Sequence, residues 1–175
     1  MKVTHLHIEA SSFCNARCPG CPRNAYGYPL EGFYKQAHLK PEKLREILDK
    51  FPEVQSILYC GNHGDPMMNP DIVELCDVGK SISVATNGGI GLLKDYELLA
   101  KNGVQITFGI DGLDDTNHLY RQGVKWDNLI ERVKTFITAG GQATWQFIRF
   151  QHNMDQVEQA KSLSKEMGFV DFFAI

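Results

Sequence analysis

Three cysteines lie close together near the start of this sequence, at Cys14, Cys18 and Cys21. Three residues separate the first pair and two separate the second, and no fourth cysteine follows nearby. A structural zinc site has four protein ligands, and ferredoxin-type iron–sulfur sites usually have four cysteines. Three thiolates on a four-iron cluster would leave one iron without a protein ligand, and an open metal position is typical of catalytic centres. The spacing therefore predicts a metal centre with one open position.

Two other interpretations of these cysteines stay open. They could be buried structural thiols, because free cysteine is among the most buried residue types. They could also bind zinc, with His5, His7 or His38 as the fourth ligand. Buried thiols would make the chain a plain structural domain, and zinc would make it a non-catalytic zinc-binding module. A non-catalytic module that holds an iron–sulfur cluster is a further alternative to an enzyme.

Four more polar or glycine-rich segments follow apolar runs. They are residues 61–66 (GNHGDP), 86–89 (TNGG), 111–112 (DG) and 151–153 (QHN). In parallel β/α sheets the loops after the strands share one face, which is where barrel enzymes have their active sites. We therefore expect these segments and the cysteine loop to form one site.

Elements of alternating type must position that site. Strands are predicted at residues 3–10, 54–60, 82–85, 104–110, 143–150 and 169–175, and helices at 41–51, 70–77, 94–101, 126–138 and 154–167. Strands separated by helices of this length are typical of consecutive βαβ units. Their number corresponds to about three quarters of an eight-fold barrel. We predict an α/β fold, a partial (β/α)6-type TIM barrel with parallel strands, and the alternative is a flatter doubly wound sheet.

Composition places the chain among ordinary globular domains. It has 175 residues, 43% hydrophobic and 22% charged, and a formal net charge of −3. We expect one domain over residues 1–175, no electrostatic footprint for nucleic acid, no membrane span, and a cytoplasmic location with reduced thiols. The apolar segment 169–175 lacks the helix that should cover it, so we expect further chain at the C-terminus or a partner there.

The polar segments, in order, resemble the motifs of the radical S-adenosylmethionine (radical SAM) superfamily. The three cysteines resemble the family's cluster motif, residues 61–66 its Gly-Gly-Glu-Pro motif, and residues 86–88 its Thr-Asn-Gly. Residues 110–112, with Asp115-Thr116-Asn117 and Tyr120-Arg121, resemble the fourth-strand segment of members with a C-terminal SPASM or twitch domain, such as peptide-modifying maturases. The resemblance extends over essentially the whole chain.

This resemblance implies a [4Fe–4S] cluster held by Cys14, Cys18 and Cys21, with S-adenosylmethionine (SAM) bound to the open iron. Reduction by one electron would cleave SAM to methionine and a 5′-deoxyadenosyl radical that abstracts hydrogen from a substrate. Such a chain is an oxidoreductase-like enzyme, and the electron would come from a partner such as flavodoxin or ferredoxin. The substrate could be a small molecule or a peptide, and the fourth-strand segment favours a peptide or protein.

The same resemblance implies contacts for SAM and assigns no side chain a catalytic role of its own. The region of Gly64 and Asp65 would accept hydrogen bonds from the SAM amino group, and Arg121 would pair with its carboxylate.

The remaining contacts concern the nucleoside of SAM. Thr86, Asn87 or Asp111 would bond the ribose hydroxyls, and adenine would lie near Gln146 and Ile148.

Three positions depart from the family pattern. Gly20 precedes the third cysteine where an aromatic residue is frequent, so adenine would lose a stacking wall. Asp65 replaces a glutamate and shortens its reach. Gly109 replaces a frequent serine on the fourth strand, which would remove one polar contact to the cofactor.

Overall fold

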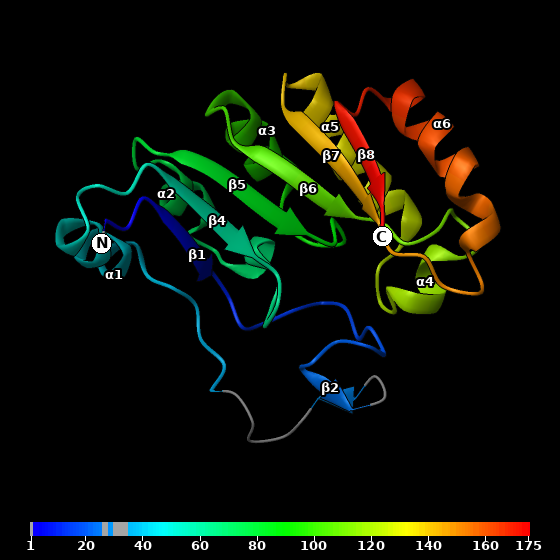
Figure 1. Ribbon diagram of the computed structural model, residues 1–175, viewed down its shortest axis with the longest axis horizontal. Helices are drawn as coiled ribbons and strands as arrows, with labels where there is room; N and C mark the ends of the chain where they lie inside the picture. Colours follow the sequence, from blue (N-terminus) through cyan, green and yellow to red (C-terminus); the bar gives the residue numbers. More distant parts are fainter. Residues whose placement is uncertain (1, 26–27, 30–34) are drawn as a thin grey trace.

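A single sheet of six parallel strands forms the frame of the protein. The computed structural model describes residues 2–25, 28–29 and 35–175. The strands are β1 (His5–Glu9), β4 (Ser56–Cys60), β5 (Ser81–Thr86), β6 (Gln105–Gly109), β7 (Gln142–Phe147) and β8 (Asp171–Ala174). They lie side by side in chain order, each parallel to the next (Figure 1). Because the order never reverses, the sheet is not doubly wound, and the predicted partial barrel is confirmed.

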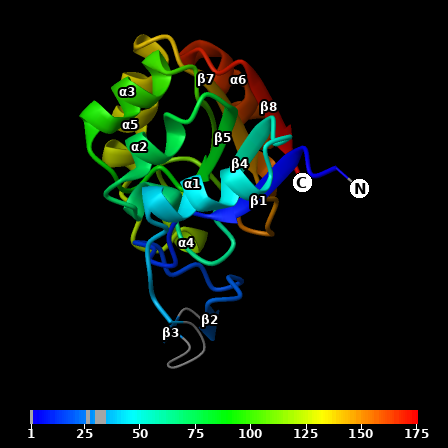
Figure 2. The ribbon, with the colours of Figure 1, turned by 90° about the vertical axis from the view of Figure 1, so that its left-hand side faces the viewer.

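The helices that connect these strands cover one face of the sheet, as Figures 1 and 2 show. They are α1 (Pro41–Lys50), α2 (Ile72–Cys76), α3 (Leu93–Lys101), α5 (Trp126–Thr138) and α6 (Val157–Met167). Pro41 occupies the first turn of α1, where its missing N–H costs no helical hydrogen bond. Gly168 ends α6 in the left-handed conformation, with φ of 88°. No helix among the described residues is long and apolar enough to span a bilayer.

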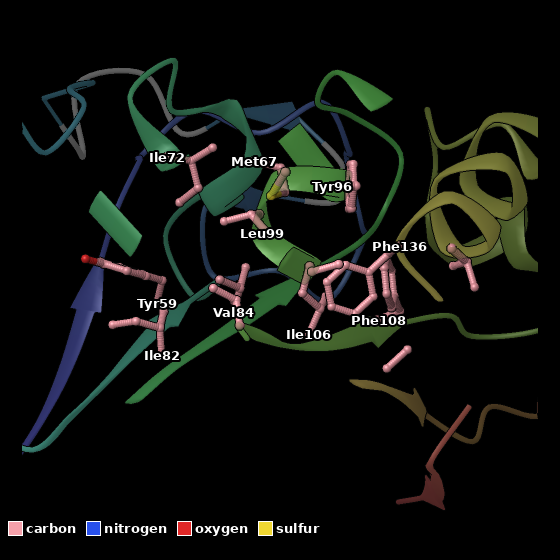
Figure 3. Close-up of a cluster of buried hydrophobic side chains, with 14 of the residues drawn as sticks. Tyr59, Met67, Ile72, Ile82, Val84, Tyr96, Leu99, Ile106, Phe108 and Phe136 are labelled. Carbon is pink, nitrogen blue, oxygen red and sulfur yellow. The ribbon is translucent and has the colours of Figure 1, made fainter. Parts of the chain in front are cut away.

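The core lies between the sheet and this helical layer. Alternate residues of each strand point to opposite faces, so one face of every strand can be apolar. Val84, Ile106 and Phe108 lie on the helix-facing side and are at most 1% exposed. Tyr96 of α3 and Phe136 of α5 pack against them (Figure 3). Burial of such side chains contributes about 1.5–3 kcal/mol each.

Most side chains on the opposite face of the sheet are polar, with Leu58 and Phe173 as exposed apolar exceptions. Ser83, Gln105 and Gln142 lie side by side in one row across neighbouring strands, and Thr107 and Thr144 lie in the next. The six strands contain neither lysine nor arginine. Sheets buried on both faces have apolar residues on both. This face is therefore built to meet water or a polar ligand.

Several elements differ from the sequence prediction. The fifth predicted strand, 143–150, ends at Phe147 because the Ile148 N–H turns away to the Asp111 carboxylate, at 2.7 Å. The helix predicted at 154–167 begins as one 3₁₀ turn, η2 (Met154–Gln156). Elements that the sequence did not predict are β2 (Asn24–Ala25), β3 (Tyr28–Pro29), η1 (Pro66–Met68) and α4 (Asn117–Tyr120).

Candidate cofactor site

The loops at the carboxyl ends of the strands enclose a cavity of about 310 Å³. In Figure 1 the arrowheads of the strands point toward the segment that carries the cysteines and toward α4. Nine of the ten predicted site residues line this cavity, namely Cys14, Cys18, Cys21, Gly64, Asp65, Thr86, Asn87, Arg121 and Gln146. Gly20, Gly109, Tyr120 and Ile148 also line it. The cysteine loop and the segments 61–66 and 86–89 thus meet at one cavity, whereas the predicted segments 111–112 and 151–153 do not line it.

Backbone hydrogen bonds shape the cysteine loop. The Cys21 N–H donates to the Cys18 carbonyl at 3.0 Å, which closes a tight turn around Pro19 and Gly20, residue types that favour turns. The Arg17 N–H donates to the Gln122 carbonyl at 2.9 Å and ties the loop to the end of α4. These two hydrogen bonds fix the backbone on either side of Cys18. All three cysteines line the cavity.

Cys18 is buried, and Cys14 and Cys21 are partly buried. Cys18 is 7% exposed, and the Cys14 sulfur accepts hydrogen bonds from the Ala16 N–H at 3.4 Å and the Asn87 amide at 3.5 Å. Burial, together with the nearby Asp65 carboxylate, raises the pKa of Cys14 to about 11. Burial also raises the pKa of Cys18, although Arg121 acts against this. A metal centre would favour the thiolates, because coordination deprotonates a thiol.

Gly64 lets two loops pack backbone to backbone. A Cβ at this position would overlap the Ser11 carbonyl oxygen and lie 2.8 Å from the Phe13 carbonyl oxygen. The adjacent Asp65 N–H donates to that Phe13 carbonyl at 2.8 Å. The glycine is required where the loop after β4 contacts the segment leading into the cysteines.

The Asp65 carboxylate points into the protein and organises the next loop. It accepts hydrogen bonds from the Thr86 hydroxyl at 2.8 Å, the Asn87 N–H at 2.8 Å and the Met67 N–H at 3.0 Å. Burial raises the pKa of Asp65, and these donors act in the opposite direction. Asn87 in turn donates to Asn15 of the cysteine loop at 3.0 Å. The carboxylate thus fixes the shape of the cavity wall.

Asp111 is the one predicted site residue that does not line the cavity. Its side chain is 0% exposed and its carboxylate accepts from the Arg121 Nε at 2.6 Å. Only 18% of the Arg121 side chain is exposed, and Arg121 and Cys18 line the same cavity. A Cβ on Gly109 would lie 2.6 Å from Arg121 Nη2. Asp111 therefore positions Arg121, and Gly109 leaves the space that Arg121 fills.

Tyr120 occupies a comparable position beside Gly20. A Cβ on Gly20 would lie 3.2 Å from the Tyr120 hydroxyl oxygen. The Tyr120 ring contacts the Phe150 ring at 4.2 Å between centroids, and Phe150 stacks on His152 at 5.4 Å. An aromatic surface is thus present at the cavity although residue 20 has no side chain.

The cysteine geometry bears on the kind of metal centre. Among the residues that the structure describes, no three His, Cys, Asp or Glu side chains converge closely enough to bind a single metal ion. A zinc ion needs such convergence, because zinc–sulfur bonds are only about 2.3 Å long. A four-iron cluster binds each cysteine through a different iron atom and so accepts sulfurs farther apart. The three cysteines on one cavity are the donor set expected for a cluster that keeps one iron open.

Comparison with known families agrees with this geometry. Residues 8–163 match the family described as the Radical SAM superfamily. This chain belongs to the radical SAM superfamily. Members of this superfamily use a [4Fe–4S] cluster and SAM, and these are the cofactors of the chain.

Two curated relatives that match this chain are described as AdoMet-dependent heme synthases. Those of Nitratidesulfovibrio vulgaris and Oleidesulfovibrio alaskensis are 28% and 33% identical to this chain over 121 residues. The match covers 66% of this chain but 32% and 30% of the two synthases. It thus spans about a third of their length.

Solved structures with the same fold come from other radical SAM proteins. Streptococcus suis SuiB bound to the precursor peptide SuiA matches 99% of this chain and 39% of SuiB, with a TM-score of 0.80 and 19% identity. Native anSMEcpe with bound AdoMet matches 98% of this chain and 50% of its own, with a TM-score of 0.79 and 18% identity. At these identities the likeness shows the fold.

Sequence reasoning did not assign the roles of two residues at this site. The sequence analysis names Tyr120 only as the neighbour of Arg121 in a motif. An aromatic residue next to a predicted SAM contact could have indicated that Tyr120 also lies at the site. Glu9 at the end of β1 gave no motif. Its Oε1 accepts hydrogen bonds from the Cys60 thiol at 2.9 Å and the Asn62 N–H at 3.1 Å, and Asn62 lines the cavity.

Proposed function

We propose that this chain is the catalytic domain of a radical SAM enzyme in which Cys14, Cys18 and Cys21 hold the [4Fe–4S] cluster. The observation that supports this most strongly is that all three thiols line one cavity together with the polar residues that the SAM motifs predict. When bound, the reduced cluster supplies the electron that cleaves SAM into methionine and a 5′-deoxyadenosyl radical, which takes a hydrogen atom from the substrate.

The chain's own side chains would bind and orient SAM beside the open iron. The free N–H groups of Arg121 suit the SAM carboxylate, because a guanidinium binds a carboxylate through two donors. The backbone at Gly64 would accept from the amino group, since the Asp65 carboxylate is already bound within the protein. Thr86 and Asn87 would face the ribose.

The base of SAM would lie at the other end of the cavity. Gln146 offers amide groups that can bond the adenine edge, and Ile148 and Tyr120 offer apolar contacts there. Enclosure by these residues would exclude water, which protects a reactive radical from side reactions.

A one-electron donor of the flavodoxin or ferredoxin type would supply the electron, and we place the protein in the cytoplasm with such donors. For the substrate we favour a peptide. Apart from His5 and His7 of β1, the strands contribute no basic side chain to the polar sheet face, whereas its Ser, Thr and Gln side chains suit amide groups. Peptide-bound forms of SuiB and anSMEcpe support the same choice.

Haem chemistry is a second candidate, because two relatives in sequence are heme synthases. Haem carries propionate carboxylates that usually need cationic partners. Tight binding of a propionate-bearing porphyrin, with no binding of neutral peptides, would favour this candidate over a peptide.

The test of the cluster assignment is anaerobic reconstitution with iron and sulfide. We expect a brown protein that forms 5′-deoxyadenosine from SAM and dithionite, measured by liquid chromatography. Cys14→Ala, Cys18→Ala and Cys21→Ala should each abolish product and reduce the iron content. Cys76→Ala is the control, because Cys76 lies in the core within α2 and should leave both readouts intact. A brown cluster without product would indicate a binding module, and a colourless zinc protein would refute both.

A further inference from the structure

We infer that the buried pair Asp111–Arg121 sets the reduction potential of the cluster, with the Arg121 guanidinium acting as a positive charge at the cavity that Cys18 lines. This inference rests on the proposed function, since it takes Cys18 as a ligand of the cluster. It gives Arg121 a second role that is independent of SAM, and it makes Asp111 a positioning residue.

The position of Arg121 is fixed from two sides. Asp111 accepts from its Nε at 2.6 Å, and Gly109 leaves the room in which Nη2 lies. Arg121 and Cys18 line the same cavity, so the guanidinium is held near a predicted cluster ligand. Arginine has five N–H donors in a planar fork, so the bond to Asp111 leaves other donors for a further acceptor.

Burial leaves the charges of this pair poorly screened. The Asp111 side chain is 0% exposed and Arg121 is 18% exposed, so solvent screens neither charge well. The guanidinium stays charged, because arginine is not deprotonated in proteins. Nearby charge and solvent exposure help to set the potential of an iron–sulfur cluster, and a positive charge beside it raises that potential.

The electron balance is simple. One electron passes from an external one-electron donor of the flavodoxin or ferredoxin class to the oxidised cluster, and no bond or proton moves. The cluster gains one unit of negative charge, which the nearby guanidinium stabilises. The Asp111 carboxylate opposes this charge, so the two members of the pair should act in opposite directions.

The experiment is a redox titration of the reconstituted protein without SAM, followed by the electron paramagnetic resonance signal of the reduced cluster. Arg121→Gln should lower the equilibrium constant for reduction at least tenfold, which is 59 mV for a one-electron couple. Asp111→Asn should raise it at least tenfold, because the cation then lacks its counter-charge. Arg121→Lys, which keeps the charge and loses the fork, should fall between Arg121→Gln and the parent.

Arg45→Gln is the matched control, because it removes the same charge from the exposed side of α1. A shift of Arg121→Gln no larger than that of Arg45→Gln would overturn the inference. So would shifts of Arg121→Gln and Asp111→Asn in the same direction, which would indicate a merely structural pair. If Arg121→Gln binds no cluster, the test uses Arg121→Lys and Asp111→Asn. Their reduction potentials should shift from that of the parent in opposite directions.

The two proposals fail in different ways. A parent protein without a cluster overturns both of them. A parent protein that binds a cluster and cleaves SAM, but whose potential is unchanged in the Arg121 and Asp111 variants, overturns only this inference.

Discussion

The Arg121 guanidinium lies over the backbone of Gly109, in the volume that a side chain at position 109 would occupy. The preceding residue, Tyr120, lies beside Gly20, where a Cβ would be 3.2 Å from the Tyr120 hydroxyl oxygen. Two consecutive residues at the end of α4 thus fill the spaces of two glycines from different loops. Substitutions at these contacts and at the loop junctions give four predictions.

Gly109→Ala should weaken SAM binding by at least tenfold, because the new methyl group would displace Arg121. Overpacking of this kind also costs about 1–3 kcal/mol of folding stability. Equilibrium dialysis with radiolabelled SAM measures the first effect and urea unfolding the second. Ser83→Ala, on the same sheet face but away from the cavity, should leave both values near those of the parent. Equal SAM affinity in Gly109→Ala and Ser83→Ala would contradict the prediction.

Gly64→Ala should destabilise the protein by about 1–3 kcal/mol or more, because the clash is with backbone carbonyls that cannot rotate away. Thermal and urea unfolding of the cluster-free protein measure this. Gly140→Ala serves for comparison, since a Cβ there meets nothing within 4 Å and only its positive φ of 92° is strained, which costs about 1–2 kcal/mol. The explanation is wrong if the two variants unfold alike and Gly64→Ala still loads its cluster.

Asp65→Asn should cost about 1–3 kcal/mol, because the new amide N–H₂ would face donors and leave buried groups unsatisfied. Thr86→Val should also lower the free energy of unfolding, because it removes the hydroxyl that donates to Asp65. Asp71→Asn is the matched control, since its ion pair with Lys40 is solvent-exposed and such pairs contribute about 1 kcal/mol or less. Denaturant titration compares the three variants, and equal losses for Asp65→Asn and Asp71→Asn would show that the buried network adds nothing.

Tyr120→Leu should weaken SAM binding about tenfold, because base–aromatic stacking contributes about 1–3 kcal/mol. Tyr120→Phe keeps the ring and its contact with Phe150, so it should bind SAM nearly as the parent does. Calorimetric titration of the reconstituted protein with SAM provides the affinities. If Tyr120→Phe and Tyr120→Leu bind SAM with equal affinity, the aromatic ring does not stabilise bound SAM by stacking.

Much of the fold follows from patterns within single segments. The apolar alternation of residues 82–85 and the helical period of residues 126–138 predict β5 and α5 nearly to their ends. In parallel β/α folds, the loops that follow the strands lie at the same end of the sheet, so the motifs in those loops are expected close together. The four residues of α4 are too few to show any period, so that helix could not be predicted.

The parts of the site that escaped prediction depend on contacts between distant residues. From the sequence alone, glycine at positions 20 and 109 implies the loss of two contacts to the cofactor. In the structure Gly20 makes room for Tyr120, and Gly109 makes room for Arg121. Asp111 was expected at the ribose. Its carboxylate is instead enclosed by the Arg121 guanidinium and the Ile148 N–H, and nothing in the local sequence reveals those partners.

The sheet leaves β1 and β8 as its two margins, not bonded to each other. A closed cylinder would admit only molecules that pass through its mouth. The six described strands form an open trough instead, so their polar face can be approached across the margins of the sheet as well as from the end that carries the cavity.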